Sequence, residues 1–304
     1  MGASLDIIKI SSIARSVKPA RIYPHITPAL RGAFGYTLNR LFNKADGKPG
    51  LYETLFKNET ESVYSDVYVS GKPNPYVFEA PVQAKTSLSA GDCFSFNLTL
   101  FGTACGHVPE VLFTIEQMLK DNIMNNNRAF ELYSAVNAFT REPIYADDAV
   151  CDIALAARPW KWTDTIDPHI CANRILIRFP KPVSIKENGK PAGSISFLLL
   201  IRAVLNRLRL LTSVYGGNFN GIDRGDLEER AKSVITIYSK LRDTSFVTFS
   251  RTQMQKKTYH GLTGDIVYEG DITPFLPYIN IGGILHIGRN TVLGMGEYEW
   301  RIEQ

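Results

Sequence analysis

Five glycines and one arginine crowd a segment near the end of the chain, from Gly282 to Gly296. Glycine has no Cβ, so a chain rich in it can approach a ligand closely and point several N–H groups at phosphate oxygens. Arg289 adds a permanent positive charge that can fork onto a phosphate. The segment therefore predicts phosphate contacts at Gly288, Arg289, Gly294 and Gly296. The alternative interpretation is a tight turn that requires positive φ.

A second segment, residues 251–261, places cations among amide and aromatic side chains. Arg251, Lys256 and Lys257 can each neutralise an RNA phosphate, and Tyr259 offers a ring on which a base can stack. The segment therefore predicts RNA contacts at the three cations. A solvated hairpin tip is the alternative interpretation of the same residues.

A histidine stands ahead of an expected first helix, in the run Arg21-Ile-Tyr23-Pro-His25. An imidazole titrates near neutral pH, so His25, beside Tyr23, could do acid–base work on a ribose hydroxyl. Arg21 and Arg31, which lies inside the helix, are further candidate RNA contacts. The alternative for His25 is an ordinary polar surface residue. A second candidate histidine, His286, stands beside the glycine-rich segment.

Several function classes are disfavoured. There is no H-x-x-x-H pattern and no cluster of carboxylates, so we expect no metal site and no cofactor. The four cysteines are not spaced as a zinc knuckle or a redox pair, which fits a reduced cytoplasm. The longest apolar stretch, Ile195 to Val204, is too short to span a bilayer. With no signal-peptide pattern and a net charge of +4, we expect a cytoplasmic protein without a membrane partner that tolerates an anionic one.

The order of expected elements occurs twice along the chain, and each half resembles a split βαβ arrangement. We therefore predict an α+β fold of two tandem ferredoxin-like (RRM-like) domains, residues 1–155 and 165–304. The expected elements of the first are a strand at 6–11, a helix capped by Thr27 and opened by Pro28, a loop or weak hairpin at 44–75, a strand at 94–101, a helix from Pro109 and a strand at 129–138. Those of the second are a strand at 173–179, helices at 194–215 and 227–241, paired strands at 246–251 and 264–269 joined by a basic, flexible connection, a helix from Pro274 and a closing strand at 296–302.

Four segments resemble, in the same order, a known family, the CRISPR-associated repeat endoribonucleases of the RAMP superfamily. The resemblance extends over residues 20 to 304, and its most specific part is the glycine-rich segment from Leu285 to Gly296. Residues 122–128 depart from the family, because relatives often carry glycines there. The matching segments are Leu30–Gly35, Gly91–Gly102, Ser250–Gly264 and Leu285–Gly296.

The resemblance implies two RRM-like folds that bind CRISPR repeat RNA and process it to crRNA, for antiviral defence. It implies cleavage by the ribose 2′-hydroxyl, without a metal, to a 2′,3′-cyclic phosphate and a 5′-hydroxyl. That chemistry needs a base, an acid and positive charge near the phosphate. Many members place a histidine in or near the loop before the first helix, where His25 lies with Tyr23 close enough to help. His286 is the rival candidate.

Two other functions remain open at this point. A non-catalytic crRNA-binding subunit of a CRISPR effector complex would share the fold and the glycine-rich segment but would need no histidine. A general binder of single-stranded RNA would expose aromatic rings along a strand. His25 and His286 both stand beside expected RNA-binding elements and therefore favour the endoribonuclease. Other CRISPR effector subunits are further candidate partners.

Overall fold

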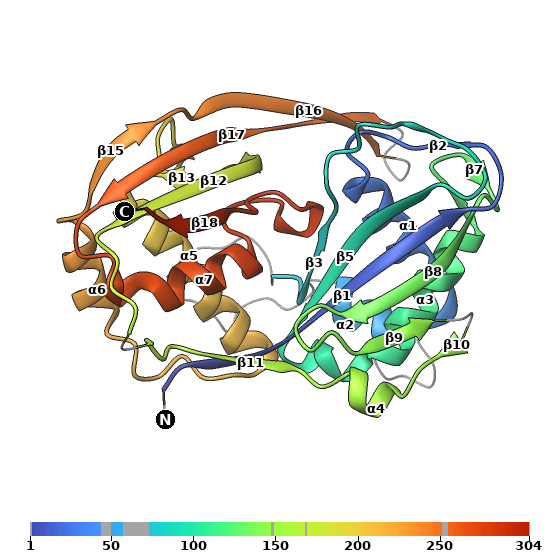
Figure 1. Ribbon diagram of the computed structural model, residues 1–304, viewed down its shortest axis with the longest axis horizontal. Coiled ribbons are helices and arrows are strands. Elements are labelled where there is room, and N and C mark those ends of the chain that lie inside the picture. The colour runs from blue at the N-terminus through green and yellow to red at the C-terminus, as the bar shows by residue number, and fades with distance from the viewer. Residues whose placement is uncertain are drawn as a thin grey trace. The chain divides into compact units, whose positions relative to one another are not determined.

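The computed structural model (Figure 1) describes residues 2–43, 50–56, 73–146, 149–167, 169–250 and 255–303. The chain divides into two compact units. The N-terminal unit contains residues 6–161 and 214–216. The C-terminal unit contains residues 1–5, 162–213 and 217–304.

The N-terminal unit is built on an antiparallel sheet whose central strands lie in the order β8-β1-β5-β3. With two helices between strands, this is the β-α-β-β-α-β order of a ferredoxin-like fold. Its main elements are β1 (Ser4–Ser16), α1 (Thr27–Leu41), β3 (Tyr76–Glu79), β5 (Cys93–Phe101), α3 (Val108–Lys120) and β8 (Phe130–Asn137). Smaller elements are β2 (Ala20–Arg21), α2 (Leu51–Phe56), β4 (Ser87–Leu88), the 3₁₀ turn η1 (Gly102–His107), β6 (Asn122–Ile123), β7 (Asn126–Asn127), β9 (Pro143–Ala146), β10 (Ala149–Val150), α4 (Ile153–Ala156) and β11 (Trp160–Thr163).

The C-terminal unit repeats the same order of elements. Its sheet has the order β15-β17-β12-β18, and β16 pairs with the first half of the long strand β17. The two units confirm the predicted class of tandem ferredoxin-like folds. Their elements are β12 (Arg174–Val183), β13 (Lys186–Glu187), β14 (Lys190–Pro191), α5 (Phe197–Tyr215), α6 (Arg224–Ala231), β15 (Ile235–Ser239), β16 (Arg242–Ser250), β17 (Gln255–Glu269), η2 (Thr273–Phe275), α7 (Leu276–Leu285), η3 (Thr291–Leu293) and β18 (Glu299–Ile302).

Apolar side chains on one face of each sheet pack against the helices. In the N-terminal unit, the ring of Phe34 in α1 meets Phe78 in β3 edge to face, with centroids 5.4 Å apart. In the C-terminal unit, Phe197 at the start of α5 contacts Tyr268 of β17 at 5.2 Å and Phe275 at 5.0 Å. Such aromatic pairs add to the burial of apolar area, so each helix is fixed over its sheet.

Two elements of the C-terminal unit differ from the sequence prediction. The helix predicted for residues 227–241 is wrong, because α6 ends at Ala231 and residues 235–239 form strand β15. The prediction of a basic, flexible connection between two strands is also wrong for those of its residues that the structure describes. There residues 255–263 form the first half of β17, paired with β16. In β15, the β-branched residues Ile235 and Ile237 stand at alternate positions, a pattern that favours a strand.

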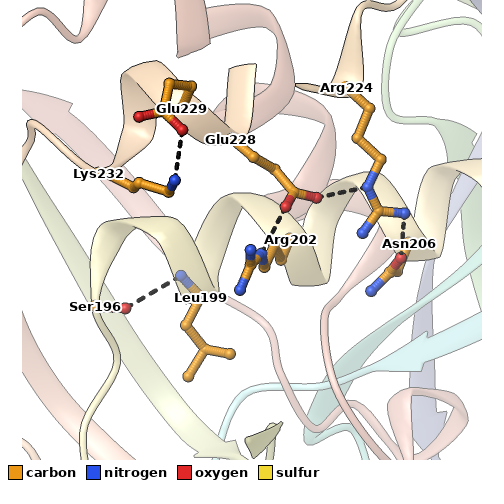
Figure 2. A network of polar contacts seen from close by, with 8 residues as sticks. All are labelled: Ser196, Leu199, Arg202, Asn206, Arg224, Glu228, Glu229 and Lys232. Atoms are coloured by element: carbon orange, nitrogen blue, oxygen red, sulfur yellow. Dashed lines mark hydrogen bonds and ion pairs between the residues drawn. The ribbon is translucent and has the colours of Figure 1, made fainter. Parts of the chain in front are cut away.

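Helix α6 is held on α5 by one carboxylate and two guanidinium groups (Figure 2). Glu228 accepts hydrogen bonds from Arg202 Nε at 2.7 Å and Arg224 Nε at 2.6 Å, and Arg224 also donates to Asn206 at 2.9 Å. Partial burial pushes the pKa of Glu228 up, but the bonds from the two arginines outweigh it and keep the pKa below its usual value. These pairs make α6 a fixed part of the unit.

The C-terminal unit includes residues from the start of the chain. Ser4 exchanges two backbone hydrogen bonds of 2.8 Å with Asn218, which follows α5. Gly217 has φ +125, and a Cβ there would lie 2.7 Å from the Ser4 carbonyl oxygen. Ala3 and Leu5 are fully buried. Close approach of these two segments therefore requires glycine at position 217.

Candidate functional site

The loop before α1, which carries three predicted site residues, has a fixed backbone. Strand β2 pairs with β4, and beyond it Ile22 N–H donates to Thr86 O at 2.9 Å. On the same side Gln83 N–H donates to Pro24 O at 2.9 Å. Ile22 and Ile26 are buried and anchor the two ends of the loop. A side chain between them therefore projects from a supported backbone.

Arg21, Tyr23 and His25 project from this backbone in the part of the loop that reaches solvent. Arg21 is exposed, Tyr23 keeps 48% of its surface exposed, and His25 is half-buried two residues before α1. Extended residues alternate in direction, and the sequence from Ala20 to Tyr23 is alternately buried and exposed. The structure thus brings a cation, a phenol and an imidazole together along one short loop.

Arg31, one turn into α1, is engaged inside the N-terminal unit. Its guanidinium carbon lies 4.9 Å from the centroid of the Phe56 ring, a cation–π contact. Burial raises the pKa of the neighbouring Tyr76 hydroxyl to about 12, and the charge of Arg31 offsets part of that rise. Arg31 is half-buried, so this packing limits how far its side chain can reach into solvent.

His286 ends α7 and is completely buried. Its Nδ1 lies 3.1 Å from the carbonyl oxygen of Met295, across the glycine-rich segment. Its backbone has φ 57 and ψ 150, a conformation that residues other than glycine rarely adopt. The ring is therefore held inside the segment it was expected to flank.

The glycine-rich segment is folded tightly on itself. Gly288, Gly294 and Gly296 all have positive φ, and a Cβ on Gly296 would lie 1.8 Å from the Ile287 carbonyl oxygen. The N–H groups of Ile287, Arg289 and Gly296 donate to the carbonyls of Gly296, Ser184 and Pro182. These three N–H groups are therefore used within the protein, while the Arg289 side chain is exposed. The glycines shape the loop, and the arginine faces solvent from it.

Replacing Gly296 by Ala should destabilise the C-terminal unit by more than about 3 kcal/mol, because the new methyl group meets a backbone oxygen and φ stays positive. Urea unfolding measures this. Gly193→Ala is the matched control, since a Cβ there meets nothing within 4 Å, and it should change stability by less than about 0.5 kcal/mol. Equal stability of the two variants would show that the loop can accommodate a side chain at position 296.

Lys256 and Lys257 lie on strand β17 opposite Phe249 and Thr248 of β16. Adjacent strand residues point to opposite faces, so these two lysines serve different faces of the hairpin. The ring of Tyr259 stacks on Phe246 of β16, with centroids 5.3 Å apart. Arg251, the third predicted cation of this segment, lies outside the described residues.

Two further properties of the structure bear on metal binding and on membrane insertion. Over residues 2–303, where described, the structure has no group of three or more His, Cys, Asp or Glu side chains arranged to hold a metal ion. In the same described part of the chain, no helix has the length and apolar character needed to cross a membrane.

The described structure thus contains two ferredoxin-like units and a tight glycine-rich loop that exposes one arginine, Arg289. Two family profiles match the chain. One, described as an N-terminal domain, matches residues 5–156, and the other, described as CRISPR-associated endoribonuclease Cas6, matches residues 177–298. The second match assigns the C-terminal unit, over residues 177–298, to the Cas6 family of CRISPR-associated endoribonucleases. No curated protein matches it in sequence.

Solved Cas6 structures share the fold. Cas6 of Thermus thermophilus superposes with a TM-score of 0.57 at 13% identity, over 99% of this chain and 100% of that one. A Cas6 product complex superposes with a TM-score of 0.60 at 14% identity, over 97% of this chain and 100% of that one. A partial Cas6-RT-Cas1–Cas2 complex also gives 0.60 at 13% identity, over 98% of this chain. The chain spans only 46% of the length of that last chain.

Proposed function

We propose that this protein cuts CRISPR repeat RNA within precursor transcripts and so releases guide RNAs. The ribose 2′-hydroxyl attacks the adjacent phosphate, the bond to the 5′-oxygen breaks, and the products are a 2′,3′-cyclic phosphate and a 5′-hydroxyl. No metal takes part. The match of residues 177–298 to an endoribonuclease family supports the class of reaction, and the arrangement of the loop before α1 supports the mechanism.

The observation that carries this proposal is the contrast between the two candidate histidines. His25 is half-buried on a supported loop with an exposed tyrosine two residues away, whereas His286 is fully buried with its ring against Met295. A group that exchanges protons with RNA must reach it within hydrogen-bond distance. His25 therefore moves the proton, and His286 holds the shape of the glycine-rich loop.

The remaining predicted residues supply binding and positive charge. Tyr23 donates a hydrogen bond to the reacting phosphate or ribose, and Arg21 stabilises the charge that develops on the phosphate. Arg289 holds a phosphate at the glycine-rich loop. Lys256 and Lys257 attract the RNA to the two faces of the β16–β17 hairpin.

The partners proposed are CRISPR repeat RNA, crRNA and other CRISPR proteins. A structural relative is described as a Cas6 product complex, another as a Cas6 substrate mimic complex, and a third as part of a complex with Cas1 and Cas2. These descriptions support an RNA substrate and a place among other CRISPR components.

Cleavage of candidate repeat RNAs in EDTA tests the reaction. We expect one cut per repeat at the same rate with and without EDTA, because the 2′-hydroxyl is the nucleophile. Mapping of the termini should find a cyclic phosphate that acid opens, and a 5′ end that polynucleotide kinase labels directly. A requirement for magnesium, or a 5′-phosphate on the product, would overturn this mechanism.

A further inference from the structure

The loop before α1 and the hairpin β6–β7 lie next to each other beyond the paired ends of strands β1 and β8. Ser16 of β1 pairs with Phe130 of β8, and Val17 N–H then donates to Ala129 O at 2.9 Å. Lys18 follows Val17 and Arg128 precedes Ala129, so both residues adjoin this hydrogen bond. The neighbouring segments therefore bring together residues that are more than a hundred positions apart in sequence.

Asn126 fixes the far end of this contact. Its Oδ1 accepts a hydrogen bond from Arg21 N–H at 2.9 Å, and its Nδ2 donates to Arg21 O at 2.5 Å. One amide side chain thus satisfies both backbone groups of Arg21, as a neighbouring strand would. The hairpin that presents it turns through Met124 and Asn125, which have φ 52 and 63, and packs through buried Ile123. Asn126 is therefore held rigidly against the loop that carries Tyr23 and His25.

Three cations lie along this contact without an acidic partner. Lys18, Arg21 and Arg128 are exposed, and the described residues give none of their side chains an ion pair or a hydrogen bond. The acids in the neighbouring segments are already occupied. Asp121 pairs with Arg40 at 2.7 Å, Asp92 with Lys85 at 2.6 Å and Glu131 with Arg15 at 2.6 Å.

We propose that Lys18, Arg21 and Arg128, named here the basic strip, bind successive phosphates of the RNA, with Arg21 at the scissile phosphate and the other two beside it. Asn126 positions the catalytic loop next to this strip. The proposal rests on the function proposed above. Like charges placed close together repel each other, so the strip gains most from an anion that spans it. A polynucleotide backbone is such an anion, and the strip leads directly to Tyr23 and His25.

The strip is tested by the salt dependence of RNA binding. The RNA carries a 2′-deoxy sugar at the cleavage site, so binding is read without cleavage. Each lost phosphate contact lowers the slope of log K against log salt by about 0.7 for a single strand, so Lys18→Gln with Arg128→Gln should lower it by about 1.4. The matched control, Lys120→Gln with Arg230→Gln, removes the same charge from residues paired with Glu116 and Asp271. Its slope should not change.

The proposed role of the strip would be overturned if the slope fell in neither double variant, or if it fell equally in both. This binding result does not depend on whether His25 is catalytic. If the strip variants behave as expected while His25→Ala cuts normally, the strip stands and the catalytic assignment fails. If His25→Ala is inactive and the strip variants keep the wild-type slope, only the strip fails.

Asn126 is tested by separating rate from affinity. Asn126→Ala should lower the single-turnover rate at saturating RNA about tenfold or more, because a shift of about 1 Å in a catalytic group can cost 10²-fold. The dissociation constant for the uncleavable RNA should stay within about twofold of the wild-type value. The positioning role would be refuted if the rate were unchanged. It would also be refuted if thermal unfolding showed a loss of folded protein that matches the loss of rate.

Discussion

RNA with a 2′-deoxyribose just upstream of the scissile phosphate should not be cut at all. The proposed nucleophile is then missing, and no side chain on the described loop replaces it. The same RNA should bind with an unchanged affinity, because the cations contact phosphates and not the 2′-hydroxyl. Gel analysis of single-turnover reactions measures both properties.

The control is an RNA with the deoxy sugar one nucleotide downstream, which should be cut at the normal rate. Loss of cleavage with both RNAs would mean that a distorted backbone, rather than a missing nucleophile, stops the reaction. Cleavage of the upstream deoxy RNA would mean that water attacks the phosphate, and the proposed mechanism would be abandoned.

His25→Ala should lower the single-turnover rate at least about a hundredfold, since a general acid or base contributes roughly 10²- to 10⁴-fold. RNA affinity should stay within about threefold, because a half-buried imidazole contributes little to the electrostatic attraction. His286→Ala should weaken affinity more than rate, because it removes the contact with Met295 that shapes the glycine-rich loop.

Two results would contradict this assignment. If His25→Ala cuts normally while His286→Ala binds RNA without cutting it, the roles of the two histidines are reversed. If neither variant changes the rate, no histidine is catalytic, and the arginines of the loop become the candidates for stabilising the transition state. Unfolding curves of both variants show whether lost activity reflects lost structure.

The fold could be predicted from the sequence because its signals are local. Strand β5 alternates apolar and polar residues, and helix α5 repeats apolar residues at helical spacing, so both were placed within a few residues. Strand β15 was missed because Leu227 and the apolar residues that follow it also fit a helical spacing. The end of α6 at Ala231 depends on tertiary packing, which the pattern does not contain.

The site could be predicted only in part. Sequence patterns indicated His25 and the glycine-rich segment. His25 and His286 differ in how deeply they are buried, and burial depends on contacts such as that between His286 and Met295. The bond between Asn126 and Arg21 joins positions 105 apart in sequence. A run of asparagines such as that at 125–127 is typical of a turn, and nothing in it indicates which asparagine reaches the loop.

The hydrogen bonds between Ser4 and Asn218 also bear on how the chain folds. The C-terminal unit is complete only when residues near the start meet residues that follow α5, which closes a very long loop. Contacts of such high sequence separation slow folding. During synthesis, Ser4 can therefore make these two bonds only after the segment that follows α5 has emerged. A fragment limited to residues 162–303 would lack this strand end and should fold to a less stable state than the same unit in the whole chain.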